Sequence, residues 1–269
     1  MRLFPEKVRL GNFHLPFYVL SLLTILFISL PLMIVIITSF NASSGVNFPP
    51  VGFSLKWYQN MLQRKAFAET AQLSFLLATL TTLFATCIGF LSSLAIVRYR
   101  FVGRSLLNAI ILSPLIIPEV VTGLTFLFLF NRIKMHNSFL NILVLHILLA
   151  LPYSIRVISA NLYRFNIALE EAAMSLGANR IRTFFWVTIP LTKSGLITAA
   201  IFSFVISFNN FTATLFLVFQ KSTLPVEIFS YIRTENDPTI ASISTSLIIL
   251  TVGLILVSER IVGLERFTR

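Results

Sequence analysis

The chain has 269 residues, of which 56% are hydrophobic and 12% are charged, with a net charge of +11. Soluble domains carry about 25% charged residues, so this composition excludes an ordinary soluble protein and indicates a chain that crosses a membrane several times. The positive charge does not indicate nucleic-acid binding, because Lys and Arg cluster just outside the apolar segments, where they orient a chain in a bilayer.

Six apolar segments are long enough to span a bilayer as helices, which takes about 20 residues. The first exceeds the apolar core of a signal peptide, about 7–15 residues, so we expect it to remain as an anchor. The alternation typical of a membrane β-barrel is absent, and we predict an all-α membrane protein with one transmembrane domain over residues 1–269. The expected spans cover about residues 15–39, 71–97, 106–130, 139–158, 196–219 and 242–258.

The distribution of Lys and Arg predicts the orientation of these spans. With the N-terminus inside, the inner loops and termini carry more basic residues than the outer loops. Cytoplasmic loops are enriched in Lys and Arg, so we expect both termini, and the loop of residues 164–190, to lie in the cytoplasm. The inner basic residues include Arg2, Lys7, Arg9, Arg98, Arg100, Arg104, Arg266 and Arg269.

The loop after the first span contains a short amphipathic pattern. Ser54 is a candidate N-cap, and Leu55, Tyr58 and Leu62 fall on one helical face. We expect a helix on the outer membrane surface, with Trp57 and Tyr58 at headgroup level. The alternative is a docking surface for an outside partner.

Glu119 is the only acidic residue well inside a predicted span. It follows Pro114 and Pro118, each of which removes a backbone donor and breaks or kinks a helix. Broken helices at membrane depth are tolerated where they pack in protein or line a cavity. Glu119 is therefore a candidate for a substrate pathway; the alternative is a structural acid that pairs with a neighbouring helix or is hydrated near the interface.

The fifth span carries two adjacent amides, Asn209 and Asn210, in the middle of an apolar segment. Adjacent residues point about 100° apart on a helix, so one amide can bond a neighbouring helix while the other faces the pathway. Phe208 and Phe211 share a face and are candidates for an apolar constriction. Packing against lipid is the alternative for these two rings.

No pattern typical of an enzyme is present. His14, His136 and His146 are isolated in the sequence, and the H-E-x-x-H, P-loop and G-x-S-x-G motifs do not occur. The single cysteine, Cys87, allows neither a disulfide framework nor a thiolate metal site. We predict no catalytic residue, no metal site and no ATP site in this chain, with His146 a hydrogen-bonded helix residue.

The polar insert between the fourth and fifth predicted spans has the pattern of two short helices. Asn166 is a candidate N-cap, and Gly177 is suited to end the first helix in a left-handed conformation. Pro190 closes the second helix. Two short helices at an angle form a compact knob on which a partner can dock. The apolar stripe of the first helix consists of Leu169, Ala172, Ala173 and Leu176.

The insert resembles the EAA loop of binding-protein-dependent ABC importer permeases, E-A-A-x3-G-x9-I-x-L-P. Glu171-Ala172-Ala173, Gly177 and Val187-Thr188-Ile189-Pro190 match it, with Val187 and Ile189 as conservative replacements. The resemblance implies a type I ABC importer permease fold with six transmembrane helices in a bacterial inner membrane. The residues that it assigns to ATPase coupling are Glu170, Glu171, Ala172, Ala173, Gly177 and Pro190.

The resemblance also implies the partners. These are a second related permease in a heterodimer, two copies of a cytoplasmic subunit that binds ATP and Mg, and an external substrate-binding protein. The chain also resembles the second permease of spermidine/putrescine-type importers, which implies a polyamine or a related small organic solute. That group is expected to have acids where this chain has Asn209 and Asn210, so the substrate stays open. The alternative function is an ATPase-independent secondary transporter or channel.

Overall fold

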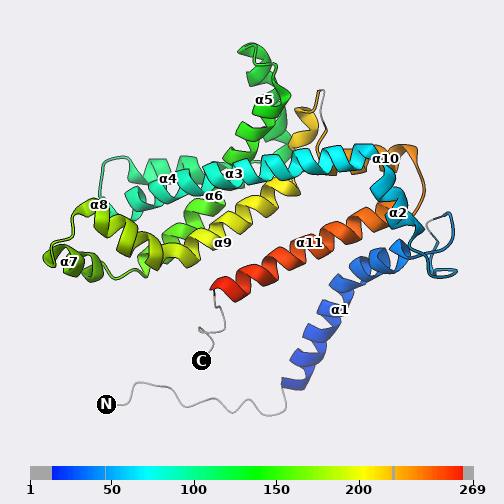
Figure 1. Ribbon diagram of the computed structural model, residues 1–269, viewed down its shortest axis with the longest axis horizontal. Coiled ribbons are helices and arrows are strands. Elements are labelled where there is room, and N and C mark those ends of the chain that lie inside the picture. Colours follow the sequence, from blue (N-terminus) through cyan, green and yellow to red (C-terminus); the bar gives the residue numbers. More distant parts are fainter. Residues whose placement is uncertain (1–13, 46, 220–221, 263–269) are drawn as a thin grey trace. The chain divides into compact units, whose positions relative to one another are not determined.

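The computed structural model describes residues 14–45, 47–219 and 222–262 of the chain (Figure 1). The described residues are helical apart from loops and one isolated β-bridge between Asn41 and Phe53. Within them, five helices are long and apolar enough to cross a membrane, or six if one bent pair is a single span. The predicted all-α, multi-pass architecture is confirmed. The basic residues predicted near the two termini, Arg2, Lys7, Arg9, Arg266 and Arg269, lie outside the described residues.

The chain divides into two compact units. The first contains α1 (His14–Ser39), α2 (Lys56–Gln63) and the beginning of α11 (Thr239–Val262). Trp57 on α2 is buried and its Nε1 donates to the Asn41 carbonyl at 2.8 Å, while the Tyr58 hydroxyl lies 2.8 Å from Ser39 Oγ. The polar atoms of both rings thus bond the protein, which fixes α2 against the end of α1; the position of α2 at headgroup level stays a prediction.

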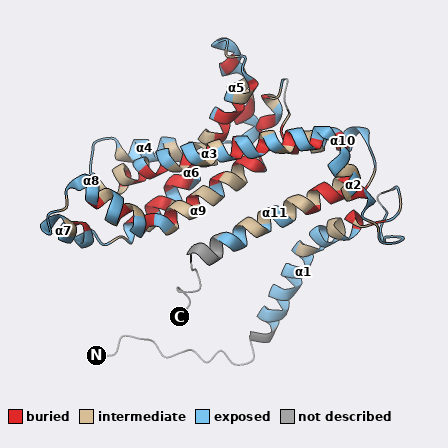
Figure 2. Ribbon diagram, viewed as in Figure 1, coloured by how far each residue is buried: buried red, intermediate tan, exposed pale blue. Residues whose placement is uncertain are grey.

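The second unit is built around three long helices that pack side by side: α3 (Lys65–Arg98), α6 (Ser138–Tyr163) and α9 (Ile189–Phe208). Buried residues are frequent along α3 and α6 (Figure 2). Small residues allow close approach, since a Cβ on Gly89 would lie 2.8 Å from Ser154 Cβ. The Ser154 and Ser203 hydroxyls, 2.8 Å apart, link α6 to α9. The remaining elements of this unit are α4 (Arg104–Leu112), η1 (Ser113–Leu115), α5 (Glu119–Arg132), α7 (Ala168–Ser175), α8 (Arg180–Thr183), the π-helix η2 (Phe184–Thr188), η3 (Thr214–Phe216), α10 (Leu224–Thr234) and the end of α11.

Two of the predicted spans are interrupted. The segment predicted over 106–130 is two helices bent by 103° at the break before Glu119. Pro118, at the N-cap of α5, has no N–H to continue the preceding helix. The segment predicted over 196–219 stops being an α-helix at Phe208, so Asn209 and Asn210 follow α9 rather than lying in the middle of a helix. Both interruptions bring non-helical backbone among the core helices.

Candidate functional site

Helix caps form the first part of the knob, residues 164–190. The Asn166 side chain accepts from the Ala168 N–H at 3.1 Å, and Gly177 has φ +90°. The Gly177 N–H donates to Met174 O at 3.0 Å and the Ala178 N–H to Ala173 O at 3.1 Å, which is the paired pattern of a Schellman motif. The left-handed glycine expected from the sequence therefore ends α7 and turns the chain toward α8. The prediction that Pro190 closes the second helix is wrong, because Pro190 lies in the first turn of α9, where its missing N–H is tolerated.

The surface of the knob carries apolar side chains that the bundle leaves exposed. Leu169 is 47% exposed and Leu176 89%, and Ala172 is also exposed while Ala173 is half-buried. Ile181 on α8 is 71% exposed. The apolar stripe of α7 thus faces away from the core, with the exposed Glu171 beside it.

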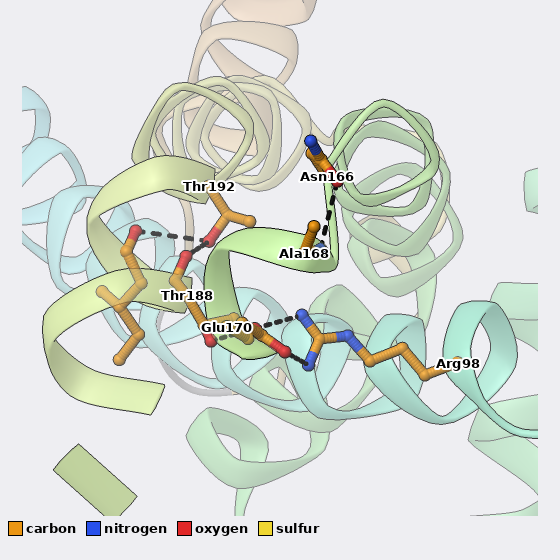
Figure 3. Close-up of polar contacts among 7 residues, drawn as sticks. Arg98, Asn166, Ala168, Glu170, Thr188 and Thr192 are labelled. Carbon is orange, nitrogen blue, oxygen red and sulfur yellow. Dashed lines mark hydrogen bonds and ion pairs between the residues drawn. The ribbon is translucent and has the colours of Figure 1, made fainter. Parts of the chain in front are cut away.

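Glu170 faces the opposite way and is buried (Figure 3). Its carboxylate accepts two hydrogen bonds from the Arg98 guanidinium, at 2.6 and 2.8 Å, and one from the Thr188 hydroxyl. Thr188 in turn is bonded through its carbonyl to the Thr192 hydroxyl at 2.7 Å. Glu170, which the resemblance assigns to ATPase coupling, therefore lies on the inner side of the knob, with its carboxylate enclosed by these partners.

The Arg98–Glu170 pair joins the knob to the long helices. Arg98 is in the last turn of α3, and Thr188 is the last residue of η2, directly before α9. Pairs of this bidentate geometry hold both charged groups in a fixed orientation. The sequence did not indicate Arg98 and Thr188 as partners of Glu170. The available signal was that Glu170 is a second acid beside Glu171 and that Arg98 is a basic residue at the end of a nearly uncharged helix.

A polar cavity of about 400 Å³ lies where the bent pair and the end of α9 meet. It brings together four of the predicted pathway residues: Glu119, Asn209, Asn210 and Phe211. Phe208 is not among its lining residues, since this ring is buried and stacks on Phe204 with a centroid distance of 5.5 Å. The lining that the sequence did not indicate includes Leu149, Tyr153 and Val205.

Glu119 and Asn210 are directly bonded in this polar cavity. Asn210 Nδ2 donates to Glu119 Oε2 at 3.2 Å, and Asn210 is buried while Glu119 and Asn209 are exposed to the cavity. Among the described residues, Glu119 forms no ion pair, so a basic side chain does not compensate its charge. The carboxylate and the Asn209 amide remain available to a polar or cationic molecule.

Close backbone packing holds α5 at this position. A Cβ on Gly123 would lie 2.7 Å from the Ala213 carbonyl oxygen and 3.0 Å from its Cα. Only a glycine allows α5 to approach the 213–216 segment so closely without displacement. The placement of Glu119 against Asn210 therefore depends on this contact one turn further along α5.

Other parts of the described chain are weaker candidates for a ligand-binding site. A cavity of about 670 Å³ between α3 and α10 is lined by Glu69 and Glu227, but Glu69 is already 3.4 Å from Lys65 Nζ. Within the residues that the structure describes, no group of three His, Cys, Asp or Glu side chains could hold a metal ion. The knob and the polar cavity are thus the two candidate functional regions.

Comparison with known families decides what kind of protein carries these regions. The family described as "Binding-protein-dependent transport system inner membrane component" matches residues 85–264, which include both of them. The chain belongs to this family. It is therefore a multi-pass inner-membrane permease, and the predicted family and localisation are confirmed.

Three relatives in this permease family are 27–31% identical to the chain. The spermidine/putrescine transport system permease protein PotC of Escherichia coli (strain K12) is 27% identical, over 87% of this chain and 89% of PotC. The putrescine transport system permease protein PotI of the same strain is 31% identical, over 88% and 86%. The molybdenum transport system permease protein ModB of that strain is 29% identical, over 71% and 89%.

Solved structures show the same fold. A bacterial ABC transporter involved in the import of the acidic polysaccharide alginate contains a chain that superposes with a TM-score of 0.68 at 16% identity, covering 98% of this permease and 99% of that chain. An amino acid ABC transporter with histidines gives a TM-score of 0.59 at 14% identity, covering 77% and 97%. The predicted ABC importer permease fold is confirmed; at these identities the likeness extends to the fold alone.

Proposed function

We propose that this permease forms half of the translocation pathway of an ATP-driven importer. The knob docks on a cytoplasmic ATP-binding subunit, and the polar cavity is part of the substrate path. A second, related permease supplies the other half, and an external binding protein delivers the solute. The permease has no ATP site of its own in this scheme, since ATP and Mg are bound by the two copies of the ATPase subunit.

The observation that carries this proposal is the two-sided construction of the knob. Leu176 and Ile181 are exposed on its outer surface, whereas Glu170 is buried against Arg98 on its inner surface. Exposed apolar side chains rimmed by polar residues are typical of a surface that a protein partner covers. The buried ion pair joins this surface to α3. A displacement of the bound partner would therefore move the knob and α3 together.

The path of that displacement follows from the contacts. Movement of the knob acts on α3 through Arg98 and on α9 through Thr188. The other end of α9 leads directly into Asn209 and Asn210, which line the polar cavity. Closure of two ATPase subunits would thus tilt α3 and α9 and change access to the cavity, which is alternating access by rigid-body motion of packed helices.

The proposed solute is a small organic cation of the polyamine class. PotC and PotI, which transport spermidine/putrescine and putrescine, are the relatives that support it. In the polar cavity, Glu119 supplies a carboxylate without a basic partner among the described residues, and a protonated amine is its natural ligand. Asn209 adds a neutral amide that is exposed to the cavity, whereas the Asn210 amide donates to Glu119. A single carboxylate would then select for an amine at one end of the solute.

Reconstitution tests this function. The permease is purified from its native membrane through an affinity tag, together with the subunits that remain bound, and is placed in proteoliposomes with its binding protein. We expect an ATP-binding subunit to co-purify and radiolabelled putrescine to enter only with ATP and Mg. Molybdate uptake is the matched control, because ModB is a relative of comparable identity. Uptake by the chain alone, without nucleotide, would establish a secondary transporter or channel instead.

A further inference from the structure

His146, in the middle of α6, takes part in a hydrogen-bonded chain that ends at the polar cavity. Its imidazole is 2% exposed, with Nδ1 2.8 Å from Ser207 Oγ and Nε2 2.8 Å from Thr214 Oγ1. Ser207 Oγ lies 3.3 Å from Thr81 Oγ1 on α3. The ring therefore contacts hydroxyls of α9 and η3 directly and is linked to α3 through Ser207.

The orientation of the Asn210 amide can be assigned from its neighbours. The backbone N–H of Thr214 lies 3.2 Å from one terminal atom of the Asn210 side chain. A backbone N–H can only donate, so this atom is the oxygen Oδ1. The other terminal atom, 3.2 Å from Glu119 Oε2, is therefore the nitrogen, and it donates to the carboxylate.

The same reasoning determines the direction of the remaining bonds. Thr214 Oγ1 lies 2.8 Å from Asn210 Oδ1 and 3.1 Å from Asn210 O, and both of these atoms only accept. The single hydroxyl hydrogen of Thr214 is thus directed to Asn210. Toward His146 the hydroxyl can only accept, so His146 Nε2 carries a hydrogen and donates it.

The other ring nitrogen is then an acceptor. The His146 ring contacts two hydroxyls and, within the described residues, no carboxylate, so it is neutral, since an unpaired buried charge is very costly. A neutral imidazole with a hydrogen on Nε2 has a free lone pair on Nδ1. The single hydrogen of the Ser207 hydroxyl has two acceptors within reach, His146 Nδ1 at 2.8 Å and Thr81 Oγ1 at 3.3 Å, and we assign it to the shorter contact. The hydrogen bonds consequently run in one direction: Ser207 donates to His146, His146 donates to Thr214, and Thr214 donates to Asn210.

We propose that His146 is a positioning residue of the substrate path: its Nε2–H orients Thr214, which holds the Asn210 amide so that Nδ2 faces Glu119. This inference rests on the proposed function of the polar cavity. Without the Nε2–H donor, the Thr214 hydroxyl is free to turn toward the imidazole position, Asn210 Oδ1 loses one of its two donors, and the carboxylate of Glu119 is held less well.

Two substitutions of His146 separate this role from simple packing. The amide nitrogen of Gln occupies nearly the place of Nε2 and can donate to Thr214, whereas the amide oxygen of Asn occupies nearly the place of Nδ1 and can only serve Ser207. We expect His146→Asn to raise the KM for putrescine uptake by the reconstituted complex about fivefold, the effect of one hydrogen bond. His146→Gln should restore most of the affinity, with Vmax similar in both.

A second pair of variants checks the same link at Thr214. Thr214→Val keeps the shape but removes the hydroxyl, and it should raise KM as His146→Asn does; Thr214→Ser should restore it. The double variant His146→Asn with Thr214→Val should be no worse than either single variant. Equal losses in His146→Asn and His146→Gln, with matching losses of thermal stability, would mean that the ring only fills space and would overturn the proposal.

A readout independent of transport keeps this proposal distinct from the proposed function. Solid-state 15N NMR of the assembled complex, with only this permease isotopically labelled and with His14→Gln and His136→Gln to leave one labelled imidazole, reports which nitrogen of His146 is protonated. We expect a hydrogen on Nε2 and a bare Nδ1; a hydrogen on Nδ1 alone would refute the positioning role. If the expected tautomer, with the hydrogen on Nε2, is found but Glu119→Gln leaves putrescine uptake unchanged, the proposed substrate path fails instead.

Discussion

Glu170 in the knob and Glu119 at the polar cavity are two carboxylates of the same helical unit in opposite electrostatic situations. Glu170 is enclosed by a bidentate guanidinium and a hydroxyl, which together compensate its charge. Glu119 accepts one hydrogen bond from a neutral amide and faces a cavity. The first arrangement is complete without a ligand and the second is not.

The difference shows how to distinguish a structural from a functional acid in a membrane protein. An uncompensated charge among apolar helices is costly, so it is retained where another molecule supplies the compensation. The sequence indicated Glu119 as a pathway candidate and Glu170 as a coupling residue, but it did not indicate that Glu170 is buried and paired with a guanidinium. Mutations should therefore affect assembly and stability at Glu170 but solute affinity at Glu119.

The largest effect is expected on the exposed surface of the knob. Gly177→Asp should abolish ATP-dependent uptake while the protein still reaches the membrane, because it places a side chain on a backbone with φ +90° and a charge on the proposed docking surface. Uptake and immunoblotting of membranes measure both outcomes.

Gly103→Asp is the matched control for this substitution. Gly103 has φ +89° and, like Gly177, open space where a Cβ would be, but it lies before α4 and outside the knob. The backbone strain is thus the same in both variants. Similar uptake by the two variants would mean that strain, rather than the docking surface, explains the loss.

The next largest effect is expected from opening the buried ion pair. Arg98→Gln leaves Glu170 buried without its cation, which should lower the free energy of unfolding by about 3–5 kcal/mol. The double variant Arg98→Gln with Glu170→Gln should lose less than the sum of the single variants, because both charges are then absent. Thermal unfolding of the purified complex measures each value.

The exposed pair Lys65–Glu69, with an N–O distance of 3.4 Å, is the comparison for this double-mutant cycle of Arg98 and Glu170. Its side chains are 89% and 63% exposed, and exposed pairs contribute less than about 1 kcal/mol. A coupling energy for Arg98 and Glu170 as small as that of the surface pair would contradict the role of Glu170 as the attachment of the knob.

The smallest of the three effects is expected at the polar cavity. Glu119→Gln removes the charge but keeps the size and one acceptor, so assembly and thermal stability should stay close to wild type. The KM for putrescine should rise about tenfold, the value of one hydrogen bond to a charged group. A stability loss comparable to that of Arg98→Gln, with KM unchanged, would make Glu119 a second structural acid and remove the contrast with Glu170.

Local sequence patterns were sufficient to predict several helix ends and four of the residues that line the polar cavity. Gly177 ends α7 with positive φ as expected, since only the local chain geometry decides a helix cap. Pro118 breaks the third segment because a missing N–H acts within one turn. Glu119, Asn209, Asn210 and Phe211 were selected as polar or aromatic residues at membrane depth, and they meet in one cavity.

Partners that are distant in the sequence could not be found in this way. The pairing of Glu170 with Arg98, the burial of Phe208 on Phe204 and the placement of His146 between Ser207 and Thr214 each depend on how helices pack. The sequence alone determined that the chain is an all-helical membrane permease, because hydropathy, proline positions and motif spacing act over short distances. Only the tertiary structure decided that Glu170 is neutralised and that Glu119 faces a cavity, because charge compensation depends on residues brought together across the bundle.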